Sequence, residues 1–222
     1  PGHRTLAEKA FATLHTAIIT GQLRPGARLP IEELADLLEM SPMPIREAVR
    51  RLDAAGLVEN IPHRGARVTE LSIRDLAEVY EVRLELEVLA IGRAAERFSA
   101  AHATEARRCL NALAALADEV SAAASEAHTR FHFALYGAAD SAWLLRLISP
   151  VWETSERYCL QAPEVRRLAR RAAEHEEILA ACEAHAPHRA AAALYDHLAV
   201  TANSLATAMG GEPLFSGRDT PA

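Results

Sequence analysis

The chain has 222 residues, 50% of them hydrophobic, so it can bury a sizeable core in one large domain or two small ones. Its net charge of -6 argues against a protein that coats nucleic acid or membranes nonspecifically, although a local cluster of arginines remains compatible with it. The three cysteines are isolated, and no apolar run approaches the roughly 18 residues of a membrane span, so we expect a soluble cytoplasmic protein.

The charge is distributed unevenly along the chain. Residues 1–70 contain nine Lys or Arg and nine Asp or Glu, whereas the remainder contains fifteen and twenty-one. The whole net charge therefore belongs to the C-terminal part. This shift predicts a neutral module over residues 1–70, an acidic helical domain over residues 71–210 and a flexible tail over residues 211–222.

Two helices are predicted at the start of the N-terminal module. Apolar residues recur at helical spacing between residues 5 and 20, and Gly21 follows where a helix ends. The segment "GQLRPGARLP" is rich in turn-forming residues and leads to a short helix at about residues 31–38.

A third helix begins within "SPMPIREAVRRLDAAG". Ser41 is a suitable N-cap, Pro42 a suitable first helical residue and Gly56 a suitable stop. On a helical wheel the inward stripe consists of Ile45, Ala48, Val49 and Leu52. The exposed side carries Met43, Arg46, Glu47 and Arg50. Two arginines therefore project together from one face.

Two short β-prone runs follow, from Leu57 to Ile61 and from Ala66 to Thr69, and a tight "PHRG" turn with a basic tip joins them. Three helices and a basic hairpin predict a winged helix-turn-helix. The alternative that the pattern leaves open is a small helical module whose arginines are only solvated.

The N-terminal module resembles the DNA-binding domain of GntR-type bacterial transcription regulators. The resemblance is carried by "ITGQLRPGARLPIEELADLLEMSPMPIREAVRRLDAAGLVENIPHRGARV", which contains the family's E-L-A, P-[VI]-R-E-A, G-L-V and R-G-x-x-V elements. It implies that the third helix lies in the major groove of double-stranded DNA and that the wing reaches toward the neighbouring groove. The implied DNA-contacting residues are Arg28, Ser41, Met43, Arg46, Arg50, His63, Arg64 and Gly65.

One position departs from that family. Its members usually carry S-R-T-P where this chain has Ser41, Pro42, Met43 and Pro44, and their arginine often contacts DNA. An arginine–guanine contact worth about 1–3 kcal/mol of base discrimination would therefore be absent. We expect a different operator sequence, or a specificity that depends more on Arg46, Arg50 and the wing.

From Ile73 to Met209, long alanine- and leucine-rich stretches are separated by weak breaks. The breaks fall near residues 99–104, 137–141, 162–163 and 186–187. We expect about six helices packed as a bundle. The predicted fold class is therefore mainly α, with a winged helix-turn-helix followed by an all-helical bundle.

Two charged residues interrupt an apolar stripe in the first helix of this bundle. Arg83 and Glu87 share the helical face of Leu76, Tyr80, Ile91, Ala94 and Phe98. Two interpretations remain open: the residues form an ion pair at the edge of the core, or Arg83 clamps the carboxylate of a ligand with two hydrogen bonds.

The histidines suggest a metal site. The segment "HTRFH" places His128 and His132 on one inward helical face, a pattern that is by itself more often structural than metal-binding. His175 and His197 lie at equal distances from Ala186, inside the predicted hairpin turn "EAHAPHRA". Both then lie roughly 16 Å from the turn on antiparallel helices and can face each other. Four imidazoles can therefore converge.

The helical domain resembles the FCD effector-binding domain of the FadR-like branch of the GntR family. The resemblance is carried by "IRDLAEVYEVRLELE", "TRFHFALYGAAD", "EHEEIL" and "YDHL". Many members hold a divalent metal through an aspartate and three histidines. His132, His175 and His197 match the three histidines, and His128 occupies the aspartate position.

The nitrogen-rich set should weaken magnesium or manganese relative to softer metals. We expect zinc, with nickel, cobalt or iron as alternatives. His128 is either a fourth ligand or the position of a lost aspartate that water or the effector replaces.

Together the two resemblances imply a ligand-responsive transcription regulator. A homodimer would place two winged helices on a palindromic operator, and a small carboxylate metabolite would modulate operator binding. The candidate effector-binding residues are Arg83, Glu87, Asp140 and Thr201, although Asp140 stands where relatives often have asparagine.

Two alternatives are a regulator that senses the metal directly and a His-ligated metalloenzyme. We expect no enzyme, because Glu174 and Glu176 should point away from the helical face of His175 and no other general base accompanies the cluster.

Overall fold

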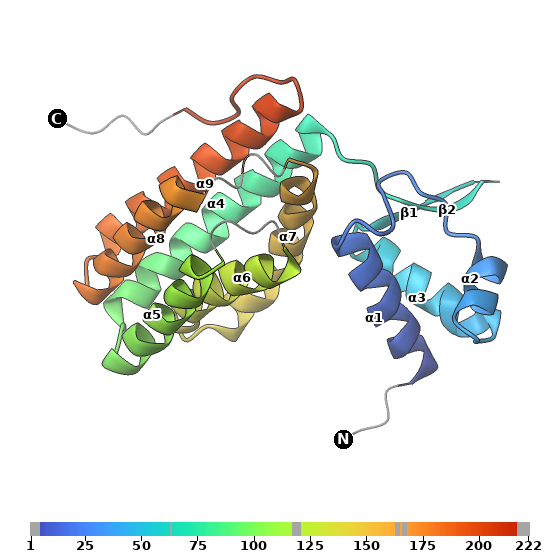
Figure 1. The fold of residues 1–222 in the computed structure, drawn as a ribbon, viewed down its shortest axis with the longest axis horizontal. Helices are drawn as coiled ribbons and strands as arrows, with labels where there is room; N and C mark the ends of the chain where they lie inside the picture. Colours follow the sequence, from blue (N-terminus) through green and yellow to red (C-terminus); the bar gives the residue numbers. More distant parts are fainter. Residues whose placement is uncertain (1–4, 63, 117–120, 163–164, 166–167, 217–222) are drawn as a thin grey trace. The chain divides into compact units, whose positions relative to one another are not determined.

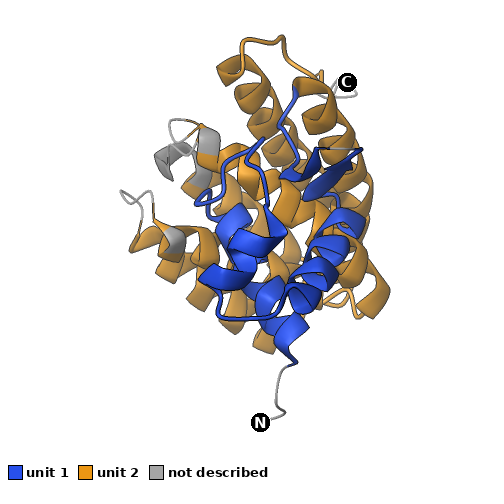
Figure 2. Ribbon diagram, turned by 90° about the vertical axis from the view of Figure 1, so that its right-hand side faces the viewer, with its two compact units in different colours: residues 1–72 blue, residues 73–222 orange. Residues whose placement is uncertain are grey.

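The computed structural model describes residues 5–62, 64–116, 121–162, 165 and 168–216. The chain divides into two compact units, residues 1–72 and residues 73–222 (Figure 2). Within the described residues the first unit holds three helices and a two-stranded sheet, and the second holds six helices (Figure 1). The predicted fold class is confirmed.

The N-terminal unit is a three-helix core with a β-hairpin. Its elements are α1 (Leu6–Ile19), α2 (Ile31–Leu37), α3 (Pro42–Ala54), β1 (Val58–Ile61) and β2 (Gly65–Val68). Helix α3 packs against α1, α2 and β1, and the strands pair antiparallel with Val58 opposite Val68. Burial of apolar side chains from all five elements holds the unit together.

Helix α3 buries the predicted stripe of Ile45, Ala48, Val49 and Leu52. Ser41 occupies the N-cap position with Pro42 after it, but the Ser41 side chain makes no capping hydrogen bond. The chain leaves the helix through Gly56, whose φ of 73° lies in the left-handed region that glycine adopts without steric cost.

A capping box starts α1. The Thr5 hydroxyl accepts a hydrogen bond from the Glu8 backbone N–H at 3.2 Å, and the Glu8 carboxylate accepts one from the Thr5 N–H at 2.8 Å. We expect Thr5→Ala to lower the free energy of unfolding by about 1 kcal/mol, because the Glu8 N–H loses its acceptor. Chemical denaturation measures this change. Thr13→Ala, the same change at an exposed position inside α1, is the control, and equal losses in both variants would contradict the capping role.

The helical unit surrounds one long central helix. Its elements are α4 (Ile73–Glu96), α5 (Ala100–Ala114), α6 (Ala122–Gly137), α7 (Ala142–Gln161), α8 (Leu168–Glu183) and α9 (Pro187–Ala208). Helix α4 packs against α6, α7, α8 and α9, and Figure 1 shows α4 running beside α9. The interruption between α5 and α6 was not among the breaks expected from the sequence.

The chain after α9 stays in contact with that helix. The Asn203 side-chain oxygen accepts hydrogen bonds from the backbone N–H groups of Leu214 at 2.7 Å and Phe215 at 2.9 Å. The Asn203 amide also donates to the Phe215 carbonyl at 2.8 Å. The start of the expected tail is therefore tied to α9, whereas residues 217–222 lie outside the described part of the chain.

Within the described ranges, no helix has the length and apolar character that crossing a membrane requires.

Candidate metal centre and DNA-binding surface

Four histidines from three helices meet in the core of the helical unit. His128 and His132 lie on α6, His175 on α8 and His197 on α9. The His132 Nε2 atom lies 3.2 Å from the Nε2 atoms of both His128 and His175. The rings of His175 and His197 have their centroids 4.7 Å apart. One nitrogen from each histidine lies within 4.8 Å of the others, so the structure brings all four predicted ligands together.

These separations suit a single metal ion. Zinc–nitrogen bonds of about 2.0–2.1 Å place neighbouring ligands of a tetrahedral site roughly 3.4 Å apart. The two separations of 3.2 Å at His132 are close to that value, and a separation at the 4.8 Å limit would have to shorten by about 1.4 Å on metal binding. The donor set consists of imidazole nitrogens, which suit zinc, copper, iron and nickel better than magnesium.

The protonation of the cluster also suits metal binding. His132 is completely buried. Burial lowers the pKa of His132 well below 6.5, and the neighbouring imidazoles of His128, His175 and His197 lower it further. Neutral imidazole is the form that binds a metal. The core therefore holds His132 in its ligating state.

A chain of hydrogen bonds leads from His132 to α4. The His132 Nδ1 atom lies 3.1 Å from the Tyr136 hydroxyl, which donates to Glu87 Oε2 at 2.6 Å. Burial raises the pKa of Tyr136 well above 10, and Glu87 raises it further, so the hydroxyl keeps its proton. With that proton directed at Glu87, His132 Nδ1–H donates to the hydroxyl oxygen and Nε2 remains for a metal.

Carboxylates lie behind two other histidines. Glu174 Oε2 lies 2.8 Å from His197 Nδ1, a hydrogen-bond distance that leaves His197 Nε2 for a metal. Glu156 Oε1 lies 3.9 Å from His128 Nδ1, too long for a direct hydrogen bond but close enough for electrostatic attraction. Glu174 was expected to point off the helical face of His175; its side chain reaches from α8 to His197 on α9, so a carboxylate does accompany the cluster.

Arg83 and Glu87 form a buried ion pair. Arg83 Nε lies 2.5 Å and Nη2 lies 3.2 Å from the two Glu87 oxygens, and Nη1 donates to Ser155 Oγ at 2.9 Å. The guanidinium also lies over the ring of Trp152 at 4.6 Å. Burial lowers the pKa of Arg83, but the Glu87 carboxylate, Tyr80 and Tyr136 together outweigh burial, and the net shift is upward. A ligand carboxylate could accept the same two hydrogen bonds from Arg83 only by replacing Glu87.

The other two effector-binding candidates have roles within the fold. Asp140 is exposed in the turn between α6 and α7, where its φ of 51° lies in the left-handed region that Asp and Asn tolerate better than most residues. Thr201 lies one turn after His197 on α9, and its hydroxyl donates to the His197 carbonyl at 2.9 Å.

Several residues of the site had not been identified from the sequence. Trp152 on α7 has its ring centroid 5.0 Å from that of His132 and 5.4 Å from that of His128. Tyr136 stands four residues after His132 on the same helical face, and this spacing was a signal available in the sequence. Trp152 and Ser155 come from a separate helix, so their positions follow only from the packing.

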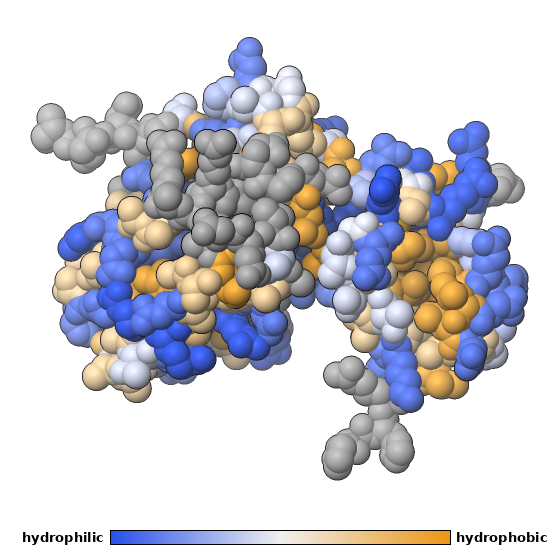
Figure 3. Space-filling view, in the orientation of Figure 1, coloured by the Kyte–Doolittle hydropathy of each residue, from blue (hydrophilic) through white to orange (hydrophobic). Residues whose placement is uncertain are grey.

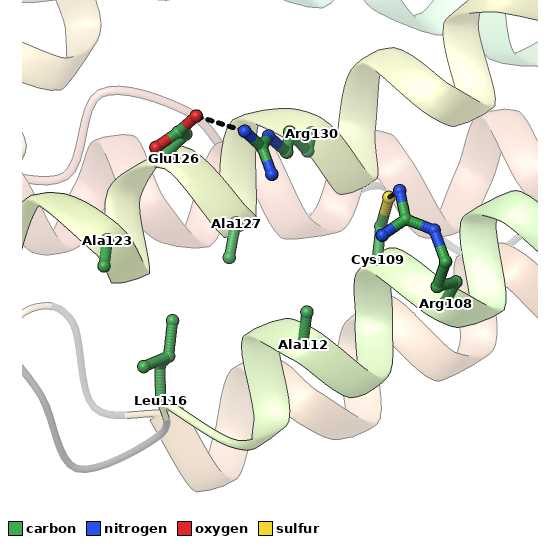
Figure 4. A pocket seen from close by; sticks show the side chains of 8 residues that line it. All are labelled: Arg108, Cys109, Ala112, Leu116, Ala123, Glu126, Ala127 and Arg130. Carbon is green, nitrogen blue, oxygen red and sulfur yellow. Dashed lines mark hydrogen bonds and ion pairs between the residues drawn. The ribbon is translucent and has the colours of Figure 1, made fainter.

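A separate cavity of about 200 Å³ lies between α5 and α6 (Figure 4). Arg108, Cys109 and Arg130 line its polar side. Arg108 pairs with Glu105 at 2.6 Å, and Arg130 pairs with Glu126. The hydrogen bond from Arg108 lowers the pKa of Glu105 to about 2. The lining of this cavity is distinct from the histidines and from the four effector-binding candidates.

The predicted DNA-contacting residues of α3 are exposed. Arg46 lies 3.1 Å from Glu32, and Arg50 lies 2.7 Å from Glu47, in pairs open to solvent. Such pairs contribute little to stability, so the arginines can exchange these partners for phosphates. Met43 is 73% exposed, and Figure 3 shows hydrophobic side chains on part of the visible face of the N-terminal unit.

The other DNA-contact candidates lie at the edges of the unit. Arg28 and Ser41 are exposed, before α2 and before α3 respectively. Arg64 and Gly65 are exposed where the hairpin turns. The φ of Gly65 is 78°, a left-handed conformation that glycine adopts without the steric cost that other residues incur. His63 lies outside the described residues.

Comparison with known proteins matches both units. Residues 6–68 match the model of bacterial regulatory proteins of the gntR family, and residues 78–200 match the FCD domain. A probable D-xylose utilization operon transcriptional repressor from Paenarthrobacter nicotinovorans is 35% identical over 93% of this chain and 92% of its own length.

Two further comparisons involve Escherichia coli. The transcriptional repressor GlaR is 26% identical over 90% of this chain and 96% of its own length. The solved structure of McbR/YncC has a TM-score of 0.78 at 24% identity, over 93% of this chain and 100% of the other, which shows a shared fold. The matching families and named relatives are transcriptional regulators and not enzymes. The chain therefore belongs to the gntR family of bacterial regulatory proteins, as a transcriptional regulator in which a DNA-binding winged helix-turn-helix precedes an FCD effector domain.

Proposed function

We propose that this regulator holds one divalent metal ion in its FCD domain and that a small carboxylate metabolite, bound at or beside the metal, modulates operator binding. The observation that carries the proposal is the convergence of four imidazoles, with one nitrogen from each within 4.8 Å of the rest. We propose zinc as the resident ion, because four nitrogen donors suit it and can surround it tetrahedrally.

The proposed metal is structural and ligand-binding. It would tie α6, α8 and α9 together, because its ligands come from these three helices. A metal bound by the folded state alone stabilises that state by about 2.7 kcal/mol when its concentration is 100 times the dissociation constant. A carboxylate oxygen can also enter the coordination of a zinc ion, which expands to five ligands.

The effector's influence on DNA requires two arrangements of the protein. We propose a homodimer that presents two α3 helices to the half-sites of a palindromic operator in the cytoplasm. The effector can change operator affinity only by as much as it prefers one arrangement of the dimer over the other. Arg83 would take part only if a ligand carboxylate displaced Glu87, because Glu87 accepts two of the guanidinium hydrogen bonds.

Fluorescence anisotropy with DNA from upstream of the regulator's own gene tests this function. The purified protein is first depleted of metal, then titrated with zinc, and finally titrated with small carboxylates, including the sugar acid derived from D-xylose. We expect zinc alone to leave operator affinity nearly unchanged and a carboxylate to shift it severalfold only in zinc-loaded protein. A full response to zinc without carboxylate would indicate a direct metal sensor. No binding to that DNA would contradict the proposal.

Arg46→Ala tests the proposed DNA-binding surface. We expect operator binding to weaken by about 1–3 kcal/mol, with reduced specificity at one base pair if Arg46 contacts a base edge. Stability should change little, because the pair with Glu32 is exposed. Arg74→Ala removes the same charge from an exposed pair on α4 and is the control. Equal affinities of the two variants would exclude Arg46 from the interface.

A further inference from the structure

A divalent ion in this cluster would have no negative charge among its four protein ligands. Neutral imidazoles leave the full charge of the ion in place, and a charge in the protein interior is costly unless other charges compensate it. His132, His175 and His197 are buried, so water screens this charge poorly. The compensation must therefore come from groups behind the ligands or from the bound effector.

Three carboxylates approach three different histidines from the side of the ring nitrogen Nδ1, opposite the Nε2 atoms that would bind the metal. Glu174 lies 2.8 Å from His197 Nδ1, and Glu156 lies 3.9 Å from His128 Nδ1. Glu87 reaches His132 through the Tyr136 hydroxyl, by contacts of 2.6 and 3.1 Å. Glu174 therefore lies at hydrogen-bond distance from a candidate ligand histidine, Glu87 is one residue removed from another, and Glu156 is close enough to a third for electrostatic attraction only.

The three carboxylates differ in how much charge they can supply. Glu87 is paired with Arg83 at 2.5 Å, so its charge is largely neutralised within α4. Glu156 is too distant from His128 for a direct hydrogen bond. Glu174 alone among the three combines a direct hydrogen-bond distance to a ligand histidine with a side chain that is mostly, though not fully, buried, at 25% exposure.

We infer that Glu174 is a positioning residue of the metal site, which fixes the orientation of His197 and supplies negative charge that the four-histidine ligand set lacks. A carboxylate that accepts from Nδ1–H fixes the tautomer with Nε2 directed at the metal and makes that nitrogen a stronger donor. An aspartate ligand would supply negative charge by binding the metal directly. Glu174 supplies part of that charge through its hydrogen bond to His197. The inference rests on the proposed metal site.

Two substitutions separate the charge of Glu174 from its hydrogen bond. Glu174→Gln keeps a side-chain oxygen that can accept from His197 but removes the charge. Glu174→Asp keeps the charge but shortens the side chain. Glu176→Gln is the matched control, because Glu176 lies on the same helix, loses the same charge and pairs with Arg107 at the surface.

The experiment measures zinc dissociation constants by competition with a chelator of known affinity, together with the melting temperature of each metal-free chain. We expect Glu174→Gln to weaken zinc binding about 10- to 100-fold, Glu174→Asp to weaken it less, and Glu176→Gln to stay within about twofold of the unsubstituted protein. Metal-free melting temperatures should agree between the two glutamine variants. The cobalt-loaded proteins should show a changed visible absorption spectrum only for the Glu174 variants.

The outcomes distinguish this inference from the function on which it rests. Equal zinc affinities of Glu174→Gln and Glu176→Gln, in a protein that binds zinc when unsubstituted, would overturn the role of Glu174 and leave the metal site intact. A loss of affinity matched by an equal loss of metal-free stability would also overturn it, because Glu174 would then act only on folding. An unsubstituted chain that binds no zinc would overturn both.

Discussion

His132→Ala is expected to remove most of the protein's metal affinity and most of its metal-dependent stability. His132 is central to the cluster, since its Nε2 lies 3.2 Å from the Nε2 atoms of both His128 and His175. It is completely buried, so the shortened side chain leaves a cavity beside the three remaining histidines. If the unsubstituted protein gains about 2.7 kcal/mol at a metal concentration 100 times its dissociation constant, the variant should lose most of that gain.

Metal content after dialysis and thermal unfolding with and without added zinc measure these effects. His188→Ala is the control, because His188 is exposed on the first turn of α9. The winged helix-turn-helix should remain folded in both variants, since it forms a separate compact unit. Unchanged metal content in His132→Ala would refute the assignment of the site.

Glu87→Ala is expected to lower the free energy of unfolding of the metal-free protein by about 3–5 kcal/mol. The substitution leaves the buried Arg83 guanidinium without its counter-charge, which is the costly way to break an internal ion pair. It also removes the acceptor of the Tyr136 hydroxyl proton. Chemical denaturation in the presence of a chelator isolates this effect from any loss of metal.

Two further variants test whether the loss of the ion pair causes this loss of stability in Glu87→Ala. Glu78→Ala breaks an exposed pair with Arg74 on the same helix and should cost no more than about 1 kcal/mol. The double variant Arg83→Met, Glu87→Leu replaces both charges with apolar side chains and should recover much of the loss. A single Glu87→Ala variant as stable as Glu78→Ala would show that the pair contributes nothing to folding.

Local sequence signals predicted most helices and both strands, and they predicted that the four histidines converge. Proline after Ser41 and glycine at position 56 delimit α3, because both act on the backbone at their own positions. The equal spacing of His175 and His197 about Ala186 placed their rings at one level, and the centroids lie 4.7 Å apart. Helical periodicity and a short turn were sufficient for this result.

The positions of the groups around the histidines depend on contacts between different helices. The sequence does not show which helices pack against one another. A helical wheel gives the direction in which Glu174 leaves α8, but not the reach of its side chain to His197 on α9. Trp152 and Ser155 meet the site because α7 packs against α4. The sequence around Arg83 likewise did not distinguish an ion pair with Glu87 from a binding site for a ligand carboxylate. Both interpretations place a charge in the same apolar stripe.

X-ray absorption spectroscopy at the metal edge of the purified, metal-loaded protein measures the number and type of atoms bound to the ion. For zinc we expect four histidine nitrogens at about 2.0–2.1 Å, with one additional oxygen when a carboxylate effector is bound. The imidazole contribution should fall by one in His128→Ala, because the His128 Nε2 atom lies 3.2 Å from that of His132. A first shell dominated by oxygen, or one unchanged in His128→Ala, would contradict a site built from four histidines.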